Sequence, residues 1–335
     1  MKIITIGMDV AKNVFQLHMV DGSGAVKRLR LGRARLLEFF AKLPASVVGM
    51  EACAGAHHWA RAIAKLGHEV RLMPPCYVKP YVKRNKTDGR DAEAIWEAMQ
   101  RPTMRFVAVK SLEQQAVMVL HRARALMVRQ RTRLANALRG HFAEFGMVAA
   151  QGIKGVRALL EQLPASAIPP VAHAALAMLA AQWQALDESI RALERQIKAA
   201  VREDEAAYRI MQIPGVGPIT ASAVVAAVAD LRQFRSGRGF AAWLGLTPRQ
   251  NNSGNKHRAG RISKQGDRNL RSLLVLGATA QLRYRNRIKD PWLSRLLMRR
   301  PVKVVAVALA AKTARIIWAV LAKEEDYRAP ARLAA

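Results

Sequence analysis

Four acidic residues in the first third of the chain are the side chains best suited to chemistry. Asp9 lies near the end of an apolar segment, Glu51 follows another, and Asp88 and Asp91 are three positions apart in a helical pattern. Residues three apart share one face of a helix, so these two carboxylates would repel each other unless a cation lay between them. Carboxylate oxygens are hard ligands that suit Mg²⁺ or Mn²⁺, and two such ions can activate a nucleophile and stabilise the leaving oxygen of a phosphodiester. The four acids are therefore candidate catalytic metal ligands, although each taken alone could instead cap a helix or a turn.

The charge of the chain indicates which polymer such a site would act on. Its 335 residues include 55 Lys and Arg against 24 Asp and Glu, a formal net charge of +31. A chain this basic repels itself unless a polyanion neutralises it, so DNA or RNA is the expected partner. We expect no membrane partner, because there is no apolar run of about 18 residues and no Lys/Arg-rich amphipathic helix at a terminus. The first ten residues are expected to form a strand, not a signal peptide, so the expected location is the cytoplasm, on the nucleoid when DNA is bound.

The two cysteines support neither a disulfide framework nor a zinc module. Cys53 and Cys76 are far apart in the sequence and form no CxxC pair. We expect both to be small buried hydrophobic residues.

Residues 1–105 alternate short apolar segments with amphipathic ones. Three runs separated by turn residues predict an antiparallel meander, and alternating helix and strand patterns follow. This is the order of a ribonuclease H-like (RuvC-like) α/β fold, in which the first strand supplies a central carboxylate and the end of the fourth a second one beside it. Here those residues would be Asp9 and Glu51. The predicted strands are 3–10, 14–20, 25–31, 46–50 and 69–73, and the predicted helices are 35–43 and 56–66.

Residues 106–205 have a helical pattern. Two long helices, over 111–145 and 174–200, are separated by a proline-containing stretch and are expected to pair as an antiparallel hairpin. The second helix has the heptad seam of a coiled coil, which could equally pack against a second copy of the chain. Its members are Leu176, Leu179, Trp183, Leu186, Ile190, Leu193 and Ile197.

The first of these helices also carries a run of arginines with no acidic residue between them. A solvated face is one interpretation of such a run, but the charge of the whole chain favours contact with nucleic acid. The arginines are Arg122, Arg124, Arg129, Arg131, Arg133 and Arg139.

Residues 206–335 are expected to form a helical domain that concentrates the positive charge. Between Arg235 and Lys303 there are 17 Lys or Arg and two acids. At its start, Ile213-Pro-Gly-Val-Gly-Pro-Ile-Thr precedes a small apolar helix, 221–229, and resembles a helix-hairpin-helix element. Gly215 and Gly217 would let a DNA phosphate approach the backbone and the helix N-terminus. A Pro-Gly turn into a core helix is the plainer alternative.

Several motifs resemble the DEDD transposases of insertion-sequence family 110, which are guided by a bridge RNA. They are Asp9, the Met50-Glu51-Ala52 turn and Asn85-Lys86-Thr87-Asp88-Gly89-Arg90-Asp91-Ala92. The stretches Gly245-Leu-Thr-Pro-Arg-Gln-Asn-Asn-Ser-Gly-Asn-Lys256 and Gly260-Arg-Ile-Ser-Lys-Gln-Gly-Asp267 are similar to the signature of that family's second domain. The resemblance spans nearly the whole chain.

The resemblance implies a RuvC-like domain, a coiled-coil insertion and a transposase domain. It implies that a serine of one protomer attacks a DNA phosphate while Mg²⁺ in the acidic site of another assists. Assembly as a dimer or tetramer follows, as does a noncoding RNA, encoded by the element, that pairs with donor and target DNA. The family commonly has Ser-Ser-Gly where this chain has Asn252-Ser253-Gly254, so Ser253 is the implied nucleophile, in a flexible polar loop.

Basic residues near Ser253 are suited to holding the scissile phosphate. They are Arg249, Lys256, Arg258, Arg261 and Lys264.

Two other functions remain possible from the residues. One is a RuvC-like, metal-dependent nuclease or junction resolvase in which water, not Ser253, is the nucleophile. The other is a nucleic-acid-binding protein without enzymatic activity, in which the four acids are capping residues.

Overall fold

The computed structural model describes residues 4–83, 88–228, 230–253, 256–283 and 290–328, apart from the side chains of Asp88, Lys256 and His257. The chain divides into two compact units, Met1–Ser111 and Leu112–Ala335. The long helices that we expected in a separate middle segment belong to the same unit as the C-terminal residues.

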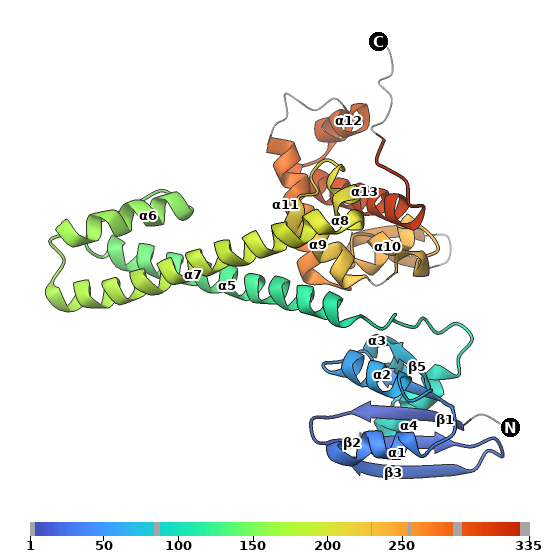
Figure 1. Cartoon of the computed structure of the whole chain (residues 1–335). Helices are drawn as coiled ribbons and strands as arrows, with labels where there is room; N and C mark the ends of the chain where they lie inside the picture. Colours follow the sequence, from blue (N-terminus) through green and yellow to red (C-terminus); the bar gives the residue numbers. More distant parts are fainter. Residues whose placement is uncertain (1–3, 84–87, 229, 254–255, 284–289, 329–335) are drawn as a thin grey trace. The chain divides into compact units, whose positions relative to one another are not determined.

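The N-terminal unit is built on one five-stranded sheet (Figure 1). Its strand order is β3-β2-β1-β4-β5, with β1, β2 and β3 antiparallel and β1, β4 and β5 parallel. This mixed α/β order is that of a ribonuclease H-like fold, as the sequence predicted. The strands are β1 (Ile4–Val10), β2 (Val14–Val20), β3 (Val26–Gly32), β4 (Ser46–Glu51) and β5 (Glu69–Met73). The helices of this unit are α1 (Leu36–Ala41), α2 (Ala56–Ala64), α3 (Pro75–Val78) and α4 (Asp88–Met99).

Helices cover both faces of this sheet. Alternate residues of β1 and β4, such as Ile6 and Met50, pack with side chains of α1 and α2 in one buried cluster. The residues between them along β1 and β4 face α4. Val47 of β4 packs with α4 residues, and the Trp96 indole of α4 donates a hydrogen bond of 2.8 Å to the Thr5 hydroxyl of β1. The alternation of side chains along a strand therefore decides which residues of β1 and β4 face α4.

Two glycines let α4 lie directly on the sheet. A Cβ at Gly7 of β1 would lie 2.2 Å from the carbonyl oxygen of Ala92 and 2.6 Å from the amide nitrogen of Trp96. A Cβ at Gly49 of β4 would lie 2.8 Å from the sulfur of Met99. Since both contacts at Gly7 are to helix backbone, no side-chain rotation could relieve them, and this position sets the distance between α4 and β1.

We expect Gly7→Ala to displace α4 and to lower the free energy of unfolding by about 2 kcal/mol, because the added methyl overpacks a backbone contact. Urea denaturation of the full-length protein, followed by far-UV circular dichroism, measures this. Gly32→Ala on β3 is the matched control, since a Cβ there meets nothing within 4 Å. Equal losses for the two variants would contradict the role given to Gly7.

Among the residues that the structure describes, the C-terminal unit is helical except for a two-stranded ribbon. Its helices are α5 (Leu112–Ala143), α6 (Ile153–Gln162), α7 (Pro170–Glu203), α8 (Glu205–Met211), α9 (Pro218–Ala227), α10 (Gly237–Trp243), α11 (Arg268–Arg283), α12 (Pro291–Arg299) and α13 (Val302–Ala322). The ribbon consists of β6 (Pro248–Ser253) and β7 (Lys256–Ile262).

Helices α5 and α7 lie side by side and run antiparallel (Figure 1). Arg124 of α5 bonds Glu194 of α7, and Arg131 of α5 bonds Asp187 of α7, so residue numbers rise along one helix as they fall along the other. The antiparallel hairpin was therefore predicted correctly. The predicted seam is only partly right: Leu176, Trp183, Ile190 and Ile197 are buried, but Leu179, Leu186 and Leu193 are half-buried, and Ala180 and Asp187 are buried instead.

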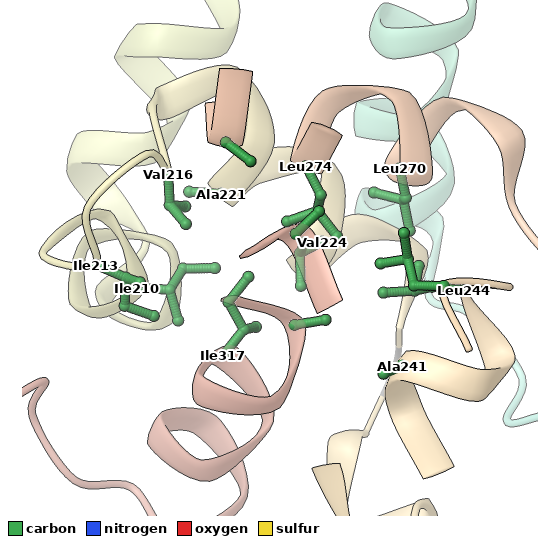
Figure 2. Close-up of a cluster of buried hydrophobic side chains, with 14 of the residues drawn as sticks. Ile210, Ile213, Val216, Ala221, Val224, Ala241, Leu244, Leu270, Leu274 and Ile317 are labelled. Atoms are coloured by element: carbon green, nitrogen blue, oxygen red, sulfur yellow. The ribbon is translucent and has the colours of Figure 1, made fainter. Parts of the chain in front are cut away.

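A second hydrophobic core joins α8, α9, α10, α11 and α13 (Figure 2). Ile210, Val224 and Ile317 come from three different helices and meet there. Helix α13 has the length and mean hydropathy (1.9) of a membrane-spanning helix, although Lys303, Lys312 and Arg315 interrupt it in the sequence. The expectation that the chain has no apolar run of about 18 residues was therefore wrong. The three cations divide the segment in the sequence, but its other residues are mostly apolar because many of them form the core.

A buried histidine connects α5 to α9. The Nε2 atom of His121 lies 2.9 Å from the Ser222 hydroxyl, and the histidine is 6% exposed. Burial, together with the nearby Arg124 guanidinium, lowers the pKa of His121 to about 4, while Asp267 acts in the opposite direction. The folded protein therefore holds His121 neutral at pH values where an unfolded chain would protonate it.

The free energy of unfolding should decrease as the pH is lowered from about 6.5 to about 4, because mainly the unfolded state binds a proton at His121 in that range. We expect a loss of about 2 kcal/mol between about pH 7 and pH 5, and no contribution above pH 7. His121→Gln cannot titrate and should lack this part of the loss. Chemical denaturation of both proteins at several pH values measures the difference, and parallel pH curves would contradict it.

Candidate functional site

Asp9 and Glu51 lie next to each other at the ends of neighbouring parallel strands. The paired residues of β1 and β4 end with Met8 opposite Met50, and Asp9 and Glu51 follow that pair directly. Neighbouring strands are about 4.8 Å apart, so the two residues occupy adjacent positions. Both are half-buried.

These two carboxylates are on the sheet face that α4 covers. Asp9 is two residues beyond Gly7, and Glu51 is two residues beyond Gly49, and both glycines face α4. Helix α4 begins at Asp88, and Asp91 immediately precedes Ala92, whose carbonyl lies against Gly7. The fold thus brings Asp9, Glu51 and Asp91 to one end of this face, from three different elements, while the side chain of Asp88 lies outside the described residues.

A thiol lies in the field of the two strand carboxylates. Burial raises the pKa of Cys53, and the negative charges of Glu51 and Asp9 raise it further. Cys53 is half-buried and Cys76 is exposed, so the expectation of two buried hydrophobic cysteines was wrong. The expectation failed because both cysteines follow strands at their polar ends, where the chain leaves the core.

The donor chemistry of this acidic pair suits a hard divalent cation, although its described geometry is incomplete as a metal centre. Two carboxylates at adjacent positions of parallel strands repel each other, and a cation between them relieves that repulsion. Within the described side chains, which omit Asp88, no three His, Cys, Asp or Glu residues are grouped closely enough to hold a metal ion. Asp9, Glu51 and Asp91 are therefore of the residue type that binds Mg²⁺ or Mn²⁺, but the described side chains do not by themselves form a metal site.

Ser253 lies at the end of the ribbon, on an exposed strand. It is the last residue of β6, and its Cα is paired with that of Lys256 at the start of β7. The expectation of a loop at Ser253 was wrong, because cross-strand pairing extends through a polar sequence of low strand propensity. Asn251 is opposite Arg258, and Ser253 is two residues beyond Asn251, so Ser253 shares its face with Arg258 while Asn252 points to the other face.

The base of the ribbon is anchored to the helical core. The amide of Ser263 donates a 2.9 Å hydrogen bond to the Thr247 carbonyl, and that of Lys264 donates a 3.1 Å bond to the Gly245 carbonyl. The Arg271 guanidinium of α11 donates to the carbonyls of Leu244 and Gln265, both at 2.9 Å. Hydrogen bonds therefore fix the end of the ribbon next to the helices, and Ser253 lies at the other, exposed end.

Comparison with known proteins places both units in one group. Residues 207–293 match the family described as "Transposase IS116/IS110/IS902 family", and residues 6–147 match a transposase family named for its DEDD residues and IS110. The chain is 50% identical to a probable family 20 transposase of Pseudomonas aeruginosa, over 98% of this chain and 99% of that protein. The chain belongs to the IS116/IS110/IS902 family of transposases. It is also 41% identical to the transposase for insertion sequence element IS1328 of Yersinia enterocolitica, over 94% of this chain and 96% of that protein. Its identity to the transposase for IS1111A of Coxiella burnetii is 43%, over 96% and 91% of the two chains.

This transposase uses the arginines of α5 in two different ways. Arg124 donates to Glu194 at 2.6 Å and 2.9 Å, and Arg131 bonds Asp187, so these two bind carboxylates of α7. The prediction that they contact nucleic acid is not supported by this geometry; a helix sequence read alone cannot show which arginines face the partner helix. Arg122, Arg129 and Arg133 are exposed, and the described residues provide no carboxylate partner for them.

The two glycines predicted to bind phosphate also differ. Gly215 has a φ of +81° and packs on α11, where a Cβ would lie 2.1 Å from the Gln281 amide nitrogen. Gln281 also donates a 2.7 Å hydrogen bond to the Pro214 carbonyl. Gly215 is therefore a packing residue, whereas Gly217, just before α9, is exposed and a Cβ there meets nothing within 4 Å.

Four of the predicted cations of the ribbon region are exposed. Arg249, Arg258, Arg261 and Lys264 all reach solvent, and Arg249 also donates a 3.3 Å hydrogen bond to the Ser263 carbonyl. The side chain of the fifth, Lys256, lies outside the described residues.

Asp187 is a residue that the sequence analysis missed. Its carboxylate, 9% exposed, bonds Arg131 of α5, Arg157 of α6 at 2.8 Å and Arg191 of α7 at 2.8 Å. An acid between Trp183 and Ile190 of the apolar seam was the available signal. This one carboxylate ties three helices together.

We expect Asp187→Asn to lower the free energy of unfolding by roughly 3 kcal/mol, because it leaves three arginines without their shared counter-charge. Glu194→Gln is the matched control: its pair with Arg124 is more exposed and should cost less than about 1 kcal/mol. Thermal unfolding of the full-length proteins compares them, and an equal or larger effect of Glu194→Gln would contradict the role of Asp187.

Proposed function

We propose that this transposase cuts and rejoins DNA with Ser253 as its nucleophile and with Mg²⁺ or Mn²⁺ held by Asp9, Glu51, Asp88 and Asp91. Membership of the transposase family supports the activity. The observation that carries the metal site is the adjacent, in-register placement of Asp9 and Glu51 on the face that the start of α4 covers. A divalent ion bound there would neutralise negative charge on a phosphodiester.

Under this proposal Ser253 forms a temporary bond to DNA. Its hydroxyl oxygen attacks a backbone phosphorus, the hydroxyl proton passes to a base, and the deoxyribose oxygen on the far side of the phosphorus leaves with the bonding electrons. A hydroxyl of the incoming strand then attacks the phosphoserine and releases Ser253. The number of phosphate ester bonds is conserved, so no external energy source is needed.

The basic residues would hold the DNA during these steps. Arg258, on the face of Ser253, is suited to a non-bridging oxygen of the attacked phosphate, where negative charge develops. Arg249, Lys256, Arg261 and Lys264 would bind neighbouring phosphates along the ribbon.

A second helical element would contribute contacts that do not depend on base sequence. Gly217 at the start of α9 would admit another phosphate in a helix-hairpin-helix manner, next to the α8–α9 turn.

Two further partners complete the proposal. A guide RNA encoded by the element would select donor and target DNA by base pairing, so that the protein contacts mainly backbone. Self-association as a dimer or tetramer would supply the several active sites that a two-ended substrate needs. Both follow from the resemblance of the DEDD and serine motifs, and the net charge of +31 supports a protein that holds more than one nucleic-acid strand.

We expect Asp9→Asn, Asp91→Asn and Ser253→Ala each to reduce formation of circular element junctions by about a thousandfold or more, because each removes a group that acts on the reacting phosphate. Asn252→Ala should retain most activity, since its position faces away from Ser253. The assay is amplification of junctions from cells carrying the protein and its native flanking element.

Two controls separate the parts of this proposal. Mn²⁺ should raise the melting temperature of Ser253→Ala but not that of Asp9→Asn, which tests the metal site without catalysis. Undiminished junctions with Ser253→Ala, together with their loss in Asp9→Asn, would instead identify water as the nucleophile.

A further inference from the structure

A basic cavity lies within the C-terminal unit, between α5, α9 and the start of α11. Its volume is about 320 Å³. Arg122 and Arg129 line it from α5, Arg268 lines it from the first turn of α11, and Ala223 and Ala227 line it from α9. None of the motifs discussed above includes Arg268.

The three arginines of this cavity form no ion pair in the described part of the chain. Arg124 and Arg131, on the same helix, bind carboxylates of α7, whereas no described carboxylate pairs with Arg122, Arg129 or Arg268. Three like charges around one cavity repel each other, and an anion between them relieves that repulsion.

The acid in the cavity wall does not supply this anion. The carboxylate of Asp267 accepts a 2.9 Å hydrogen bond from the Leu270 amide, so it caps α11. His121, also in the wall, is buried, bonds Ser222 and is neutral near pH 7, since its pKa is about 4. The net charge of the lining side chains is therefore positive.

The residues that line the cavity suit a chain of alternating sugars and phosphates. Ala125, Ala223 and Ala227 give it small apolar surfaces that a sugar ring can contact. Arg122 and Arg129 are two helical turns apart, about 10 Å along α5, which allows them to bind different phosphates.

We propose that this cavity binds the sugar–phosphate backbone of a nucleic-acid strand, with Arg122, Arg129 and Arg268 as its phosphate ligands. The inference rests on the nucleic-acid binding of the proposed function and adds a specific site to it, lined by residues outside the ribbon that carries Ser253. DNA and RNA present the same backbone chemistry, so either could occupy the cavity.

The test measures the affinity of full-length protein for a labelled DNA duplex and for a labelled single-stranded RNA over a range of salt concentrations. Each of Arg122→Ala and Arg268→Ala should weaken binding of at least one probe by about eightfold at ~0.1 M salt, and should flatten its salt dependence by about 0.9 in log–log slope. Arg202→Ala, an exposed arginine of α7 outside the cavity, is the charge-matched control and should change affinity by less than about twofold. Loss with one probe or with both identifies the strand that is bound.

A second variant adds a negative charge to the cavity wall and keeps all three arginines. Ala125→Glu places a carboxylate four residues before Arg129, so it should raise the melting temperature of the free protein and weaken nucleic-acid binding at the same time. If the wild-type protein binds the probes and the cavity variants bind them as tightly as Arg202→Ala does, the proposal of binding at the cavity is overturned and the proposed function is not. Failure of the wild-type protein to bind either probe would overturn both.

Discussion

The close approach of α4 to the sheet is the constraint that sets where Asp91 lies relative to Asp9 and Glu51. Because position 7 has no side chain, the backbone of α4 at Ala92 and Trp96 rests directly on β1. That contact brings the first turn of α4 to the sheet face on which Asp9, near the end of β1, and Glu51, the last residue of β4, lie. A side chain at position 7 would hold the helix away and separate Asp91 from the strand carboxylates. The distance of the first turn of α4 from Asp9 and Glu51 is therefore set by a glycine two residues before Asp9.

The charged residues of the chain fall into two groups, those paired within the protein and those left exposed. The chain has few acids, and some of them are committed to interactions within the protein: Asp187 joins three helices, and Glu93 of α4 pairs with Arg28 and Lys83. These pairs hold the helical hairpin together and fasten α4. The arginines that remain exposed on α5 are then available to an external polyanion, and the positive charge of the free protein becomes a driving force for binding because counterions are released.

Much of this fold could be predicted from local patterns, and the wrong predictions at Gly215, Arg124 and Arg131 have a common cause. The strands of the N-terminal unit follow from apolar runs and turn residues, and all five lie within a residue or two of their predicted bounds. The order of strands and helices also predicted that Asp9 and Glu51 would meet. What sequence could not show were long-range contacts. Gly215 looked like a phosphate-binding glycine but packs against Gly277 and Gln281 of α11, more than 60 positions away. Arg124 and Arg131 looked like their neighbours Arg122 and Arg129 until the position of α7 separated them.

The ribbon gives a physical reason to consider Asn252 and Ser253 separately. Consecutive residues of a strand point to opposite faces, so two adjacent serines could not both approach one phosphate from the same side. In this chain the serine is at the position that shares its face with Arg258, and the amide of Asn252 is on the opposite face. Asn252 stands where the family commonly has the first serine of Ser-Ser-Gly. Because position 252 is on the opposite face, this difference does not change the residues on the face of Arg258. It also gives the opposite face an amide, which can both donate and accept hydrogen bonds.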